Sequence, residues 1–177
     1  MSEPLPSPGI AIQFLRKSGC SPNVIRHCKT VAKLAIKIAK ILQKKGLVVN
    51  IELVEIGALL HDIGRSKTHS VNHSIAGAEI AKSAGLPDAV VRIIERHVGG
   101  GIPEEEAERL GWPKRNYVPE TWEERIVAYA DKLVEGNKRA PIDDAMAKLS
   151  RKLGKNHPAI ERLRALDKEF QSLLGEF

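Results

Sequence analysis

The sequence predicts an all-α protein, a single-domain helical bundle, and three observations lead to this fold class. Apolar residues recur every three or four positions along most of the chain, which is the period of an amphipathic helix. Only 4% of the residues are aromatic, and the β-branched residues fall mostly inside these helical periods. The length of 177 residues suits one domain with a sizeable core.

The first predicted helices follow a proline-rich start. Residues 1–8 hold three prolines and are expected to be a disordered lead-in. The segment 10–17 predicts a short helix. Ser21 and Pro22 are typical of an N-cap and a first helical position, and the apolar spacing after them predicts the longest helix, as far as Lys45.

The next segment, 51–60, predicts a central helix buried on nearly all sides, because only two of its residues are charged. His61 and Asp62 follow it directly, and Gly64 is a typical helix stop. Burying each charge costs several kcal/mol of desolvation, so an ion pair placed here for stability alone would gain little. An imidazole and a carboxylate at the end of a buried helix therefore indicate a bound cation.

Four more helices are predicted in the middle of the chain, after a polar loop at 65–71. They are expected at residues 73–84, 88–98, 104–110 and 121–135. The last one opens with the capping-box sequence Thr121–Glu124. Around the third, residues 102–119 are irregular and fit either a flap beside a functional site or a surface insertion.

Two amphipathic segments, 142–153 and 158–174, close the chain. Their sequences are more typical of helices that cover the core or form a dimer interface than of helices that carry catalytic residues. The sequence thus divides into a lead-in with a short helix at 1–20, the domain that carries the motifs at 21–140, and C-terminal helices at 141–177 that pack on its core.

Composition limits the function classes. The net charge of +6 is spread over helix faces, so nucleic-acid binding is not favoured. Cys20 and Cys28 form neither a disulfide framework nor a zinc motif. No apolar run approaches the roughly 18–20 residues of a membrane span, and the first residues lack a signal-peptide pattern. We therefore expect a cytoplasmic protein without a membrane partner.

Metal-competent side chains stand on helix faces that are otherwise apolar. Each histidine alone fits a satisfied core residue, but a buried carboxylate such as Asp131 must be paired or neutralised. Together they predict one metal site. The set is His27, His61, Asp62, His73, His97 and Asp131. The absence of nearby cysteines argues against structural zinc, whereas imidazoles and carboxylates suit one or two catalytic ions of iron, manganese, cobalt, nickel or zinc.

The same residues resemble a known family. His27, His61-Asp62 and Asp131 resemble the H…HD…D signature of the HD superfamily of metal-dependent phosphohydrolases, and His61-Asp62-Ile63-Gly64 reproduces its HDIG variant. The similarity spans about residues 21–136 and implies a helical bundle of the HD-domain type with a central metal site. One departure is Arg65, where many HDIG members have lysine.

The resemblance also implies a division of the ligands. His27, His61, Asp62 and Asp131 would hold one ion, and Asp62 would bridge to a second ion. His73 and His97 are similar to the two extra histidines of binuclear members, which include hydrolases of diadenosine tetraphosphate and of cyclic dinucleotides. A single ion, with these two histidines behind the ligands, is the other interpretation.

The expected reaction is attack by a metal-activated hydroxide on a phosphoester or phosphoanhydride of a nucleotide or dinucleotide. Asp62 would act at the metal, and Arg65, Lys67 and Lys132 are the nearest cations to hold phosphate. The expected partner is a phosphorylated small molecule, with a second copy of the chain as a further candidate. The alternative function is a catalytically silent, nucleotide-binding regulatory HD module.

Overall fold

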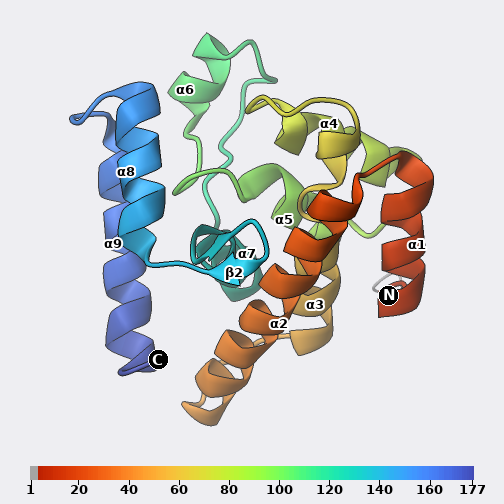
Figure 1. Cartoon of the computed structure of the whole chain (residues 1–177), viewed down its shortest axis with the longest axis horizontal. Coiled ribbons are helices and arrows are strands. Elements are labelled where there is room, and N and C mark those ends of the chain that lie inside the picture. Colours follow the sequence, from red (N-terminus) through yellow and green to blue (C-terminus); the bar gives the residue numbers. More distant parts are fainter. Residues whose placement is uncertain (1–3) are drawn as a thin grey trace.

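The computed structural model describes residues 4–177 and confirms the all-α class. The described part of the chain is a bundle of helices with one short hairpin (Figure 1). The elements are α1 (Pro8–Ser18), α2 (Pro22–Lys44), α3 (Ile51–Leu60), the 3₁₀ helix η1 (Ile63–Ser66), α4 (His73–Ser83), α5 (Asp88–Arg96), α6 (Glu104–Arg109), α7 (Trp122–Lys132), β1 (Val134–Glu135), β2 (Lys138–Arg139), α8 (Ile142–Leu153) and α9 (Pro158–Leu174).

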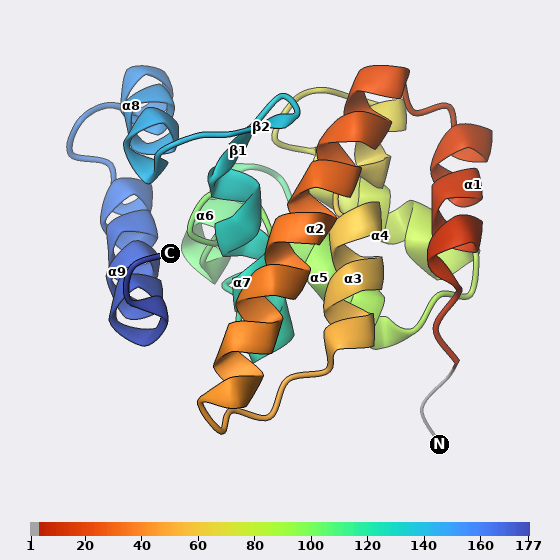
Figure 2. The same ribbon diagram turned by 60° about the horizontal axis from the view of Figure 1, so that its bottom comes forward.

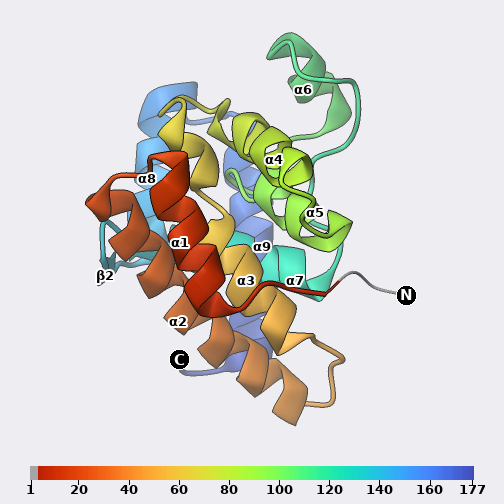
Figure 3. The ribbon, with the colours of Figure 1, turned by 90° about the vertical axis from the view of Figure 1, so that its right-hand side faces the viewer.

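Helix α3 is the centre of the bundle. It contacts α1, α2, α5 and α7, and Figure 2 shows it beside the longest helix, α2. Its residues from Ile56 to Leu60 are all buried, as its almost uncharged sequence predicts. Helices α4 and α5 lie side by side on the same bundle (Figure 3). The residues that follow α3 therefore emerge in the middle of the molecule.

The predicted caps are present. The Ser21 hydroxyl accepts a hydrogen bond from the Val24 amide at 3.3 Å, with Pro22 at the first helical position of α2. Thr121 and Glu124 form the capping box of α7. Both caps fix where helices that bear site residues begin.

The predicted end of α7 is wrong. The helix stops at Lys132, and Val134 pairs with Arg139 in a short antiparallel hairpin. Gly136 takes a φ of 60° at the turn, a conformation that glycine adopts without strain. The turn places the Gly136 carbonyl 2.7 Å from the His27 ring, so this departure from the helix serves the site.

The expected disorder of residues 1–8 is also wrong from Leu5 onward. Leu5 packs against the core, and Ser7 caps α1 by accepting a hydrogen bond from Ile10. Residues 1–3 lie outside the described residues. Among residues 4–177, we find no helix with the length and apolar character to cross a membrane.

Residues 102–119 form a small lobe with its own apolar cluster. Ile102, Ala107, Trp112 and Tyr117 are buried together, and the Trp112 indole donates a hydrogen bond to Asn72 at 2.8 Å. The two aromatic rings of this segment thus stabilise the lobe and do not line a cavity near the site.

The two C-terminal helices have different surroundings. Helix α9 packs on α2 and α7, and its Phe170 stacks on Tyr129 with ring centroids 4.4 Å apart. Helix α8 packs chiefly on α9, and of its residues only Ile142 is buried. In Figure 1, α8 and α9 lie together along one edge of the molecule, so one side of α8 faces the rest of the bundle without packing closely on it.

We predict that Gly64→Ala lowers the free energy of unfolding by at least about 2 kcal/mol. A Cβ at this position would lie 1.7 Å from the backbone oxygen of His73 and 2.6 Å from the Gly77 nitrogen, so η1 and α4 would have to separate. Gly9→Ala is the control, because a Cβ there meets only the Ser7 hydroxyl at 4.0 Å. Urea unfolding followed by circular dichroism measures both, and an equal midpoint for Gly64→Ala and wild type would contradict the packing.

Candidate metal centre

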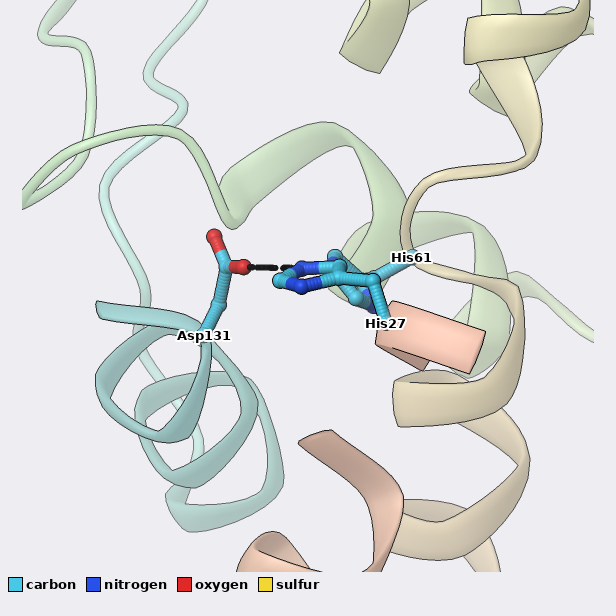
Figure 4. Close-up of side chains that lie close together, drawn as sticks. All are labelled: His27, His61 and Asp131. Carbon is cyan, nitrogen blue, oxygen red and sulfur yellow. Dashed lines mark hydrogen bonds and ion pairs between the residues drawn. The ribbon is translucent and has the colours of Figure 1, made fainter. Parts of the chain in front are cut away.

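Four imidazoles and two carboxylates meet in the middle of the bundle. The residues are His27 of α2, His61 and Asp62 at the end of α3, His73 of α4, His97 at the end of α5, and Asp131 of α7. Figure 4 shows three of them, His27, His61 and Asp131, pointing toward one another. The structure thus brings together every residue that the sequence proposed as a metal ligand.

The first group of donors lies around Asp131. Its Oδ1 is 2.9 Å from the Nε2 of His27 and 3.3 Å from the Nε2 of His61. The Oδ2 of Asp62 is 3.7 Å and 3.6 Å from the same two nitrogens. The donor atoms of His27, His61 and Asp131 therefore lie within 4.8 Å of one another, as the ligands of a single ion would, and Asp62 lies beside them.

The second group lies around the other oxygen of Asp62, and His61 is close to it as well, because donor atoms of His61, Asp62 and His97 lie within 4.8 Å of one another. Its Oδ1 is 3.1 Å from the Nε2 of His73 and 3.3 Å from the Nε2 of His97, and these two nitrogens are 3.0 Å apart. The two oxygens of one carboxylate therefore face two different pairs of imidazoles. The side chain of Asp62 is only 5% exposed, so water does little to satisfy it.

Each of the four imidazoles is held by a backbone carbonyl at its Nδ1. The carbonyls of Gly136, Ala58, Ser70 and Ile94 lie 2.6–2.7 Å from the Nδ1 of His27, His61, His73 and His97, respectively. A nitrogen that faces a carbonyl must carry the ring proton. In the neutral rings the Nε2 lone pairs are then all directed inward, which is how metal-ligating histidines are usually held.

This arrangement fits a cation. The Nε2 of His61 and the Oδ1 of Asp62 are buried without a hydrogen-bond partner in the described part of the chain. Lone pairs of His73 and His97 at 3.0 Å repel each other unless a proton or a metal ion lies between them. Buried polar groups without partners are costly, and divalent ions would satisfy all of these atoms at once.

The charge states agree with this interpretation. Burial would raise the pKa of Asp62, but the facing imidazoles outweigh it and hold the pKa well below its usual range. At Asp131, too, burial would raise the pKa, but Lys132 and the facing imidazoles outweigh it and hold the pKa well below its usual range. Burial lowers the pKa of His97 to about 4. Both carboxylates are therefore ionised and His97 is neutral, as metal ligands must be.

The pKa of His61 is shifted in the opposite direction to that of His97. Burial opposes its protonation, but Asp62 and then Cys28 and Asp131 raise its pKa well above the usual value. In the metal-free protein a proton on His61 thus occupies the place that a metal ion would take. Metal and proton compete for that nitrogen.

Two of the predicted phosphate-binding cations contact the carboxylates of the centre. The Nε of Arg65 is 3.0 Å from the Oδ2 of Asp62, and the Nζ of Lys132 is 2.9 Å from the Oδ2 of Asp131. Both also line the cavity over the centre. Lys67, the third cation that the sequence proposed for phosphate binding, is exposed and lies outside that cavity.

The cavity has a volume of about 370 Å³ and reaches His27, His73 and Asp131. One wall is a face of α8, with Asp144, Lys148 and Lys152 at intervals of four residues. Sequence reasoning missed this wall because it assigned the C-terminal helices to cover or dimerisation. The only available signal was the charged i, i+4, i+8 row, which a solvent-facing helix shows as well.

The helical bundle and its inward-facing imidazoles and carboxylates define a class of protein: an α-helical domain whose centre could hold a divalent metal ion. A family model described as HD domain matches residues 24–135. The chain belongs to the HD domain family.

Relatives and solved structures agree with this assignment. An uncharacterized protein of Methanocaldococcus jannaschii is 48% identical over 158 residues, which are 89% of this chain and 94% of that protein. A tRNA (cytidine(56)-2'-O)-methyltransferase of Picrophilus torridus is 42% identical over 97% of this chain, but the match spans only 48% of that protein. The HD domain of the phosphodiesterase PgpH of L. monocytogenes, in complex with cyclic-di-AMP, superposes with a TM-score of 0.55 at 18% identity, over 95% of this chain and 98% of that one, and supports the fold.

We predict that the purified chain binds up to two manganese or iron ions, measured by equilibrium dialysis and elemental analysis. His97→Gln should reduce the stoichiometry to one, because only the second group loses a donor. Asp62→Asn should weaken both sites, by roughly 10-fold or more each. Asp143→Asn, an exposed carboxylate of α8, is the control and should bind like wild type. Equal stoichiometry in His97→Gln and wild type would contradict two separate groups.

Proposed function

We propose that this chain is a metal-dependent phosphohydrolase that cleaves a phosphoester or phosphoanhydride of a nucleotide or dinucleotide. The observation that carries the proposal is the position of Asp62, whose two oxygens face separate pairs of imidazoles at distances between 3.1 and 3.7 Å. A shared carboxylate of this kind is suited to bridge two ions, and paired ions are typical of phosphatases and nucleases.

Divalent ions at this centre would activate a water molecule and neutralise charge on the phosphoryl oxygens. His27, His61 and Asp131 would hold one of them and His73 and His97 the other, with Asp62 shared. The carbonyl contacts at each Nδ1 fix the rings beforehand, so little reorganisation would accompany binding.

Arg65 and Lys132 have a second role in this proposal. In the metal-free protein they balance the charge of Asp62 and Asp131 at 3.0 and 2.9 Å. Ions in the centre would take over that task and weaken both ion pairs. The two side chains line the cavity and could then bind substrate phosphate, for which arginine offers a planar pair of donors.

The substrate class rests on the comparisons as well as on the site. PgpH shares the fold and is a phosphodiesterase that was solved with cyclic-di-AMP, which makes a nucleotide phosphodiester the first substrate to test. The runner-up is a phosphodiester of RNA. It is favoured by the Picrophilus relative, named a tRNA methyltransferase, of which this chain matches about half, and by the net charge of +6.

The test is a panel of nucleotides, cyclic dinucleotides and short RNAs incubated with manganese-loaded protein. We predict metal-dependent hydrolysis of at least one nucleotide phosphoester or phosphoanhydride. Asp62→Asn should lower kcat/KM by at least about 100-fold, because it removes the negative charge that would hold the ions, and the ions are what would stabilise the transition state. Asp143→Asn is the control with the same chemical change at an exposed position.

Three outcomes separate the candidates. Cleavage of RNA alone would favour the runner-up. Binding of nucleotides without turnover across the panel would contradict the hydrolase and favour the silent regulatory module. Turnover that survives Asp62→Asn would place the reaction at another site.

A further inference from the structure

A second cavity, of about 330 Å³, lies between the 102–119 lobe and the C-terminal helices. Its volume falls within the roughly 300–1,000 Å³ of small-molecule sites. It continues the cavity over the metal centre, because the two have five lining residues in common. These are Val71, Val98, Gly99, Leu149 and Lys152. A ligand can therefore extend from the metal centre into this second space, which we call the α8 groove.

The walls of the α8 groove are largely apolar. Ile102 and Leu110 come from the lobe, and Leu149 and Leu153 come from α8. Leu110 and Leu153 are 43% and 42% exposed and are two of the few large apolar side chains at the surface of the described residues. Apolar side chains exposed on two walls of one groove are typical of a site that is covered by a ligand.

The polar side chains of the α8 groove are hydrogen-bond donors and cations, apart from one carboxylate, Glu106, which is bound to Arg162. The Nδ1 of His157 accepts a hydrogen bond from the Ala159 amide at 3.2 Å, so the ring proton lies on Nε2 and can be donated. Arg109 also lines the groove. Arg162 does not count among the free donors, because it binds the Gly101 carbonyl and Glu106 at 3.1 and 2.7 Å.

The row of lysines on α8 marks the junction between the two cavities. Lys148 forms an ion pair with Glu135 of the hairpin. Lys152 lies one turn further, in the lining of both cavities, and has no ion-pair partner within 4 Å in the part of the chain that the structure describes. A cation at that place suits a phosphate or a ribose–phosphate link between the metal centre and the α8 groove.

We infer that the α8 groove binds the base of the nucleotide whose phosphate lies at the metal centre, so that α8 selects the substrate. The inference rests on the proposed function and adds a base subsite to it. A nucleobase has two apolar faces and a polar edge, and it is bound by stacking between apolar or aromatic side chains with donors at its edge. The leucines of the groove would contact the faces of the base, and His157 and Arg109 would donate hydrogen bonds to its edge.

The test compares ligands with and without a base. Calorimetric titration of the manganese-loaded full chain uses hydrolysis-resistant phosphonate analogues of adenosine 5'-monophosphate and of ribose 5-phosphate. We expect the adenosine analogue to bind about 10-fold or more tightly, the order that stacking of one base gives. Leu153→Glu should remove this advantage and leave the affinity for the ribose analogue within about twofold, because the phosphate contacts are untouched.

Two matched controls keep the test specific. Val48→Glu places the same charge at another aliphatic position, which is 92% exposed and lies just beyond the C-terminal end of α2, outside both cavities, and it should keep the base advantage. Lys152→Glu should weaken both analogues, whereas Arg151→Glu, an exposed neighbour on α8 outside both cavities, should weaken neither beyond about twofold.

The outcomes distinguish this inference from the proposed function. Equal affinity for the two analogues, or a base advantage that survives Leu153→Glu, would overturn the base subsite while leaving the hydrolase intact. Failure of either analogue to bind in a metal-dependent way, together with no turnover of the panel, would overturn both. A wild-type dimer that Leu153→Glu converts to a monomer, seen by sedimentation, would show that a second copy covers the groove and would also overturn the subsite.

Discussion

The carboxylate of Asp62 is the constraint on which the structure depends. It is nearly buried, it is ionised, and its two oxygens face different pairs of imidazoles. Around it, the outer nitrogen of each ring is bound to a carbonyl, so in every neutral ring the inward nitrogen carries a lone pair. A bundle that gathers so many acceptors at its centre, with few donors to match, is stable only if something positive is bound among them. A proton on His61, together with Arg65 and Lys132, serves this purpose in the metal-free protein, and divalent ions could take its place.

The scaffold meets this constraint by close packing of backbones. Gly64 lets η1 touch the start of α4, and a Cβ added at Gly77 would lie 2.8 Å from the Ile94 side chain and 3.1 Å from the Gly64 nitrogen. These contacts bring His73 to the same depth as Asp62. The hairpin after α7 positions His27 in a similar way, because it places the Gly136 carbonyl 2.7 Å from the Nδ1 of that ring. Fold and site are therefore linked through a few backbone positions.

The sequence predicted the helices well, and it identified the polar side chains that converge on one centre, because both follow from local patterns. The buried segment before His61-Asp62 and the capping box of α7 are local features, and metal-competent residues on apolar faces are conspicuous wherever they occur. The parts that were missed depend on tertiary packing. Neither the hairpin after Lys132 nor the burial of Trp112 follows from spacing. The approach of α8 to the centre depends on how α9 docks on α2 and α7, and an exposed charged row on α8 gives no hint of its neighbours.

The most direct measurement is anomalous X-ray diffraction from crystals grown with manganese, because it locates the ions instead of counting them. We expect two anomalous peaks on opposite sides of the Asp62 carboxylate, about 3.5–4 Å apart, one within coordination distance of His27, His61 and Asp131 and the other of His73 and His97. Peaks elsewhere on the chain, with the imidazoles and carboxylates bound only to one another, would contradict a metal centre built around Asp62.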